Sequence, residues 1–243
     1  MNSFSVPAFL LPQKPGIQRR AFLRVAGASA ATVTLVLAGC GDPEPEPIAP
    51  NTNQLNLSPD ANGLLNYVYL LKQLSTAFYK KVVDAPPTDL RTGEKAFFDD
   101  LHDHELVHRE TLRFLLATAA YDAQLATPLA FDFTSFTLTS RAGVLAAARQ
   151  LEDLLVAAFA GVLRLVRTPA SVLFLAKMAS VNARHAAFVR DLLLPGSFAD
   201  DSVVVSANGL RAVSPAKTPA QVMTETKAFF APIEVNTALL PTA

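Results

Sequence analysis

Apolar residues recur at every third or fourth position along four stretches of the chain, which is the pattern of helices that bury one face. Each stretch follows a residue that suits a helix N-cap, namely Ser58, Thr92, Ser140 and Thr168. Proline follows the first and the last of these caps, as is common at the first position of a helix. The apolar pattern ends near Val83, Ala120, Val166 and Leu194. We therefore predict four long helices.

The connections between these helices predict how they pack. The first and third are short, so each should join an antiparallel pair of helices. The second, residues 121–139, is long enough to run the length of a helix of about 25 residues, or about 37 Å. Two hairpins joined by one long crossover between helices two and three form an all-α four-helix bundle. Thr218-Pro219-Ala220-Gln221 then predicts a capping box and a short C-terminal helix, ending near Phe230, which should pack across the bundle.

Polar residues interrupt the apolar face of all four helices, close to the middle of each. They are Ser75 on the first helix, Glu105 and His108 on the second, Glu152 on the third, and Asn182 and His185 on the fourth. A carboxylate in such a position must be paired, protonated or bound to a metal, because burying it without a partner costs too much free energy. We expect these side chains to meet at one level of the core, where the Glu and His residues are candidate metal ligands.

Charge and composition exclude several classes of protein. The formal net charge is zero, but residues 1–39 hold four basic residues and no acid, which leaves 17 basic and 21 acidic residues in the rest of the chain. That balance gives no electrostatic footprint for nucleic acid. The sequence also lacks a glycine-rich phosphate loop, a nucleophile elbow and a cysteine-based metal motif.

The N-terminal region has the features of an export signal. Arg19 and Arg20 lie in a Gln-Arg-Arg-Ala-Phe-Leu-Arg segment that closely resembles a twin-arginine motif, and a weakly apolar run, residues 25–38, follows it. The segment Leu37-Ala38-Gly39-Cys40 resembles a bacterial lipobox. We therefore expect cleavage before Cys40 and attachment of lipid to its sulfur.

This signal predicts three parts of the chain and a location. Residues 1–39 form a signal peptide, residues 40–57 a lipidated and Pro-rich tether, and residues 58–243 the bundle with its tail. The twin-arginine machinery would export the protein, and the lipid on Cys40 would anchor it to a membrane of the cell envelope. Because Cys40 is the only cysteine, no disulfide can form within the chain.

Several segments of the predicted bundle are similar to those of one known family. They are Leu65-Asn66-Tyr67, Ala77-Phe78-Tyr79, Asp103-His104-Glu105-Leu106-Val107-His108-Arg109-Glu110, Phe131-Asp132-Phe133, Leu151-Glu152-Asp153 and Asn182-Ala183-Arg184-His185. On these segments, over about residues 58–230, the chain resembles the bacterial ferritin-like family of exported bundle proteins. The resemblance implies one Glu on helices one and three and a Glu-x-x-His motif on helices two and four. Together these residues hold two iron or manganese ions in members with an intact site.

The chain departs from that pattern at two of the metal-ligand positions. It keeps Glu105, His108, Glu152 and His185, but Ser75 and Asn182 stand where the family pattern has Glu. Two of the four carboxylates that would neutralise two divalent ions are therefore missing. By analogy with the family, Glu105, Glu152 and His185 could still hold one iron or manganese ion together with water.

The alternative is a polar core that holds no metal at all. Lys72 lies one turn before Ser75 and can reach Glu105 or Glu152 with its ammonium, which would replace the charge of a metal. The two histidines of the seam would then hydrogen-bond to the carboxylates, and Asn182 would complete the network.

Two functions from different classes remain open on this sequence. One is an envelope protein with a partly lost di-metal site that acts as a structural, binding or stress-related module. The other is an oxidoreductase or metal-handling protein that uses a residual mononuclear site, with His108 assisting. We interpret Tyr67 and Tyr79 as packing aromatics with hydroxyls at the surface, and His104 as a neighbour that supports a metal ligand. A homodimer is compatible with the sequence, whereas a closed storage cage fits poorly with a lipid tether.

Overall fold

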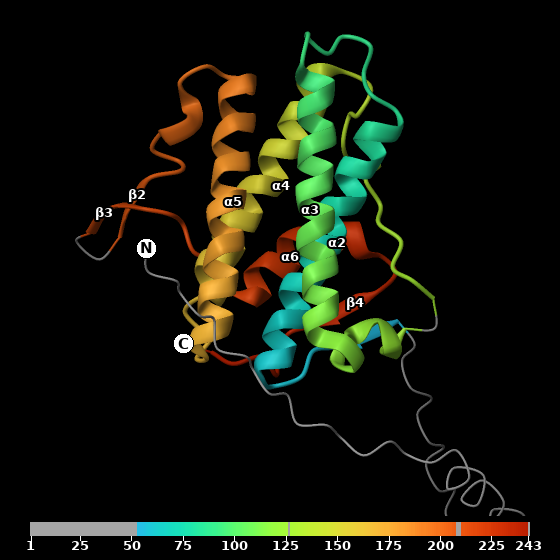
Figure 1. The fold of residues 1–243 in the computed structure, drawn as a ribbon, viewed down its shortest axis with the longest axis vertical. Coiled ribbons are helices and arrows are strands. Elements are labelled where there is room, and N and C mark those ends of the chain that lie inside the picture. The colour runs from blue at the N-terminus through green and yellow to red at the C-terminus, as the bar shows by residue number, and fades with distance from the viewer. Residues whose placement is uncertain (1–52, 126, 208–209, 243) are drawn as a thin grey trace, which may run out of the picture. The chain divides into compact units, whose positions relative to one another are not determined.

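The structure is a computed structural model that describes residues 53–125, 127–207 and 210–242. The predicted signal peptide, with Arg19 and Arg20, and the predicted lipidation site Cys40 lie outside these residues. Four long helices form a bundle of two antiparallel hairpins, in which α2 packs mainly on α3 and α4 on α5 (Figure 1). The helices are α2 (Ala61–Asp84), α3 (Glu94–Leu116), α4 (Arg141–Val162) and α5 (Pro169–Leu193). The predicted all-α bundle with one long crossover is confirmed.

The helix ends differ from the predicted ends by a few residues. Helix α2 begins two residues late, because Asp60 and not Ser58 accepts the hydrogen bond from the backbone N–H of Gly63. Ser58 instead donates to the Asp60 carboxylate, at 2.7 Å. Helix α3 is preceded by Gly93, whose φ of +87° lies in the left-handed region, and Thr92 is not its cap. Helix α4 ends at Val162, where tighter turns replace its predicted last turn.

The long crossover between α3 and α4 is fixed at its beginning by one buried side chain of α2. It contains two short 3₁₀ helices, η1 (Ala117–Ala119) and η2 (Tyr121–Gln124). The Asn66 amide donates to the carbonyl of Ala119 at 2.8 Å and accepts from the N–H of Tyr121 at 2.9 Å. Further along, Phe133 packs edge-on against Phe78 of α2, at 5.7 Å between ring centroids. These contacts hold the crossover against the bundle.

The C-terminal helix α6 (Pro219–Phe230) packs on α4, as predicted from its capping box. The Thr218 side chain accepts from the N–H of Gln221, and the Gln221 side chain accepts from the N–H of Thr218. The chain leading into α6 comes so close to α4 that a Cβ atom on Gly161 would lie 1.9 Å from the carbonyl oxygen of Lys217. The glycine therefore permits this approach, which the hydrogen bond from Lys217 N–H to the Ala157 carbonyl completes at 3.0 Å.

Two pairs of short strands accompany the helices, and the sequence pattern did not predict them. Strand β1 (Gln54–Asn56) pairs in parallel with β4 (Glu234–Asn236), and β2 (Val205–Ala207) pairs antiparallel with β3 (Leu210–Val213). The 3₁₀ helix η3 (Ser197–Ala199) follows α5. Leu55 and Leu57 are fully buried, so the folded domain includes the last residues of the segment expected to be a solvated tether. Among the described residues, none of the helices combines the length and apolarity that crossing a membrane requires.

Candidate metal centre

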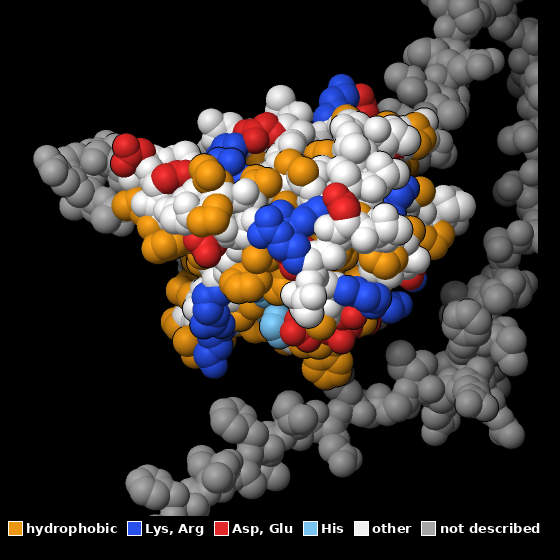
Figure 2. Space-filling model, turned by 90° about the horizontal axis from the view of Figure 1, so that it is seen from above, with side chains coloured by type: hydrophobic (Ala, Val, Ile, Leu, Met, Phe, Trp, Pro, Cys, Tyr) orange, Lys and Arg blue, Asp and Glu red, His pale blue; other side chains and the backbone are white. Residues whose placement is uncertain are grey.

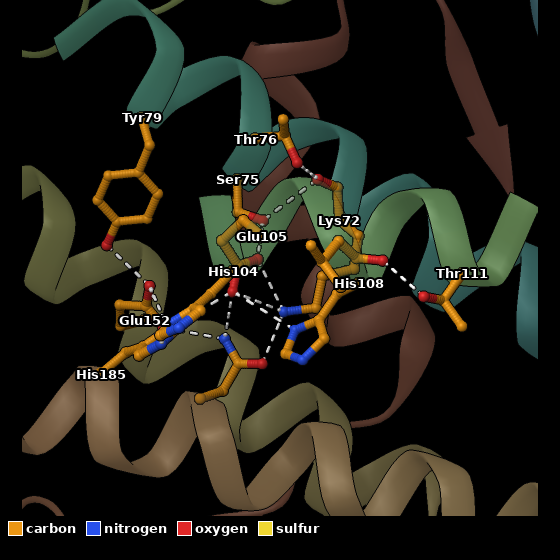
Figure 3. A network of polar contacts seen from close by, with 12 residues as sticks. Lys72, Ser75, Thr76, Tyr79, His104, Glu105, His108, Thr111, Glu152 and His185 are labelled. Atoms are coloured by element: carbon orange, nitrogen blue, oxygen red, sulfur yellow. Dashed lines mark hydrogen bonds and ion pairs between the residues drawn. The ribbon is translucent and has the colours of Figure 1, made fainter. Parts of the chain in front are cut away.

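The centre of the bundle contains a buried ion pair between α2 and α3. Lys72 and Glu105 are both completely inaccessible to solvent, and the Lys72 ammonium lies 2.8 Å and 3.0 Å from the two oxygens of the Glu105 carboxylate (Figure 3). The ammonium also donates to Oδ1 of Asn182 on α5, at 2.6 Å. Phe159 of α4 lies beneath it, with 5.2 Å between the nitrogen and the ring centroid. The lysine therefore pairs with Glu105, one of the two acids it was expected to reach.

Each oxygen atom of the two buried glutamates accepts at least one hydrogen bond. Besides Lys72, Glu105 accepts from the Ser75 hydroxyl in a short contact and from the Asn182 amide at 3.2 Å. Glu152 accepts from the same amide at 3.0 Å and from the Tyr79 hydroxyl at 2.7 Å. Ser75 and Asn182, which stand at positions where the family pattern has Glu, are thus donors to the remaining carboxylates.

Tyr79 has a different place from the one predicted for it. The whole side chain is buried, and its hydroxyl donates to Glu152 rather than reaching the surface. Burial, reinforced by the Glu152 charge, raises the pKa of the Tyr79 phenol well above its ordinary value. Tyr67 is also fully buried, and its hydroxyl has no hydrogen-bond partner among the described residues. Both residues pack in the core, but the prediction that their hydroxyls reach the surface is wrong.

The two histidines of the predicted site have opposite protonation behaviour. Burial opposes a charge on His185, but Nδ1 lies 3.5 Å from Glu105 and 3.7 Å from Glu152, and these carboxylates raise its pKa to about 9. Burial and the nearby Lys72 ammonium lower the pKa of His108 to about 4, although Glu105 is 3.9 Å away. Burial alone would raise the pKa of Glu105, yet the Lys72 charge holds it well below its ordinary value. At neutral pH His185 is therefore charged and His108 neutral.

His104 connects this network to the surface. Its ring stacks on that of His185, with centroids 5.3 Å apart and planes 2° from parallel, and Nδ1 lies 3.1 Å from Nε2 of His185 (Figure 3). His185 is buried, whereas His104 is exposed. The sequence placed His104 at the border of the apolar seam, but this stacking depends on how α3 faces α5, and no local pattern indicates it.

A centre with two metal ions does not fit these residues. The Lys72 ammonium lies between the Glu105 carboxylate and the Asn182 amide, inside the cluster where metal ions would have to bind. With both glutamates as carboxylates, Lys72 as ammonium and His185 as imidazolium, the four side chains already sum to zero charge. Two divalent ions would leave that buried cluster with a large uncompensated positive charge.

A single ion is a separate case, because three of the predicted ligands do come together. Glu105, Glu152 and His185 are all buried, and one potential ligand atom from each lies within 4.8 Å of the others. Two carboxylates and one imidazole are a donor set that suits iron or manganese. His108 is not part of this group, and its Nδ1 lies 3.9 Å from Oε1 of Glu105.

Comparison with known families agrees with the architecture. The sequence matches the ferritin-like domain family over residues 60–195, which includes the four long helices and all the candidate ligands. The chain therefore belongs to the ferritin-like domain family. No curated protein matches the sequence significantly.

Proposed function

We propose that this ferritin-like protein is an envelope lipoprotein that uses its bundle as a structural, binding or stress-related module, without two-metal chemistry. The observation that carries the proposal is the buried Lys72–Glu105 ion pair at the level of the family's metal ligands. A buried carboxylate needs a compensating charge, and here a side chain of the protein supplies it. The bundle can then keep its polar core when no metal is present.

The anchoring part of the proposal depends on the sequence alone. The twin-arginine-like segment with Arg19 and Arg20, followed by a lipobox ending at Cys40, supports export in the folded state and lipid attachment. The membrane would then be the first partner of the protein, and the export machinery a transient one. Residues 40–243 carry more acidic than basic side chains, which is unfavourable for binding nucleic acid.

A second candidate function is favoured by the cluster of Glu105, Glu152 and His185. These residues would hold one iron or manganese ion, and such an ion would supply activation of oxygen or peroxide. Binding would require His185 to lose its proton and Glu105 to share its carboxylate with the Lys72 ammonium. Both requirements lower the affinity for metal, so this oxidoreductase or metal-handling function is the alternative and not the main proposal.

The metal content of the purified protein separates the two functions. The protein is produced in medium supplemented with iron and manganese, and metal per chain is measured by plasma mass spectrometry. We expect much less than one ion per chain, with no change in Glu152→Ala. The matched control is Glu110→Ala, which removes an exposed acid from α3. One ion per chain, lost in Glu152→Ala but kept in Glu110→Ala, would refute the main proposal and establish the mononuclear site.

A further inference from the structure

An open groove runs between α3 and α5, on the side of the bundle where His104 reaches the surface. Its volume is about 500 Å³, which is in the range of small-molecule sites. The side chains that line it come only from these two helices: Phe97, His104, Val107 and His108 from α3, and Val181, Arg184, His185 and Phe188 from α5. The two helices belong to different hairpins and make few contacts with each other in the described structure.

The walls of the groove are apolar and open to water. Val107 is 61% exposed and Phe188 is 49% exposed, and both line the groove. Phe97 of α3 and Phe188 of α5 contact each other, with their ring centroids 4.3 Å apart. Exposed apolar side chains that gather around a concave surface are a feature of binding sites, because a ligand there removes their surface from water.

The polar groups of the groove favour an anion. Arg184 is exposed and forms no ion pair or hydrogen bond with any described residue, so its guanidinium is free to bind a ligand. None of the side chains that line the groove is acidic; of the acids nearby on α3, Asp103 contacts His102 and Glu110 contacts Arg109, whereas Asp100 is exposed. Seen from above, Figure 2 shows one histidine side chain at the surface beside hydrophobic ones, with both acidic and basic side chains nearby.

We propose that the groove binds a carboxylic acid with an apolar chain, such as a medium-chain fatty acid. The chain lies between Val107, Val181 and Phe188, and the carboxylate binds the guanidinium of Arg184, which can hold it with two parallel hydrogen bonds. His104 lies beside that head group and offers a further donor. The proposal does not rest on the proposed function, because every contact is made by protein side chains whether or not a metal binds.

Titration calorimetry with decanoate tests the proposal on the full-length protein, kept in a chelator. We expect saturable binding at one site per chain, and at least tenfold weaker binding of decanol, which lacks the charge. Arg184→Gln and Val107→Asp should each weaken decanoate binding at least tenfold. Two controls should stay within twofold of the unmodified protein: Lys177→Gln, an exposed cation two turns earlier on α5, and Phe114→Ser, an apolar side chain of α3 that is 83% exposed and lies outside the groove. Circular dichroism checks that each variant is folded.

Three results would overturn this inference. The first is the absence of saturable binding below the concentration at which decanoate forms micelles. The second is equal weakening by Arg184→Gln and Lys177→Gln, which would mean attraction by net charge alone. The third is a dimer in sedimentation experiments that Val107→Asp dissociates and decanoate does not, which would make the groove an interface between two copies of the chain.

Discussion

Replacement of Lys72 by methionine tests whether the lysine supplies the charge that the core needs. Methionine keeps most of the side-chain length and its apolar stem, but it leaves the Glu105 carboxylate without a cation. Both partners are inaccessible to solvent, so water does not screen the loss. Removing one member of a buried ion pair costs about 3–5 kcal/mol. We expect the free energy of unfolding of Lys72→Met, measured with urea in the presence of a chelator, to fall by that amount.

We expect a divalent metal ion to stabilise the same variant but not the unmodified protein. Without the ammonium, the cluster of Glu105, Glu152 and His185 has an excess of negative charge, which favours binding of a cation. Manganese(II) at about 100 times its dissociation constant would then restore about 2.7 kcal/mol. The unfolding midpoint of the unmodified protein should not move when manganese(II) is added.

An exposed ion pair provides the matched control. Lys80 lies 2.8 Å from Asp84, and their side chains are 63% and 59% exposed. Lys80→Met should change the free energy of unfolding by no more than about 0.5 kcal/mol, because water screens such pairs. If Lys72→Met were as stable as the unmodified protein in chelator, or if manganese(II) stabilised both proteins equally, Lys72 would not be the internal counter-ion.

Three further predictions concern other contacts of the domain. In chelator, the free energy of unfolding should rise from pH 4 to 6.5, because His108 binds a proton in the unfolded chain but not in the folded protein. It should fall from pH 6.5 to 9, because His185 keeps its proton in the folded protein but loses it in the unfolded chain. Each change is of the order of 2–3 kcal/mol, and urea titrations of His108→Gln and His185→Gln should lack the acid and the alkaline slope respectively. Tyr79→Phe should lower the free energy of unfolding by about 1–3 kcal/mol, because Glu152 loses a buried hydrogen-bond donor. Tyr69→Phe should lower it less, because the partner of Tyr69, Asp122, is accessible to water. Equal losses in the two variants would contradict this reasoning. Gly161→Ala should destabilise the protein in the same assay, because the new methyl group would meet the carbonyl of Lys217. In an open helix the same change stabilises by about 0.5–1 kcal/mol. A gain in stability would therefore show that the chain leading into α6 does not approach α4 as described.

The sequence predicted the bundle because apolar spacing and caps are local signals. Helix α5 ends within one residue of its predicted end, and the capping box of α6 is formed as expected. Local sequence does not determine the start of α2, because Ser58 and Asp60 are both good N-caps and the path of the chain selects Asp60. The β1–β4 pair had no local signal, because three-residue strands that are far apart in sequence show no periodicity.

The candidate site was predictable as a set of positions but not as a set of contacts. Helical spacing places Glu105, Glu152 and His185 on inner faces at one level, and the structure brings them together. Spacing also allows Lys72 to reach either acid, and only the packing of α2 against α3 selects Glu105. The stacking of His104 on His185 joins two hairpins, so it depends on tertiary structure alone.

The parallel pairing of β1 with β4 has a mechanical consequence for the protein. If Cys40 is anchored in a membrane, a force that pulls on the domain enters through β1, at Gln54. A pull along the strand would load the three residue pairs of β1 and β4 together, in shear, rather than opening one pair after another. Leu55, buried beneath them, resists the same displacement, because sliding the strand would bring it into water. The first element to yield would therefore be this strand pair at the edge of the domain, while the helices and their polar core remain intact.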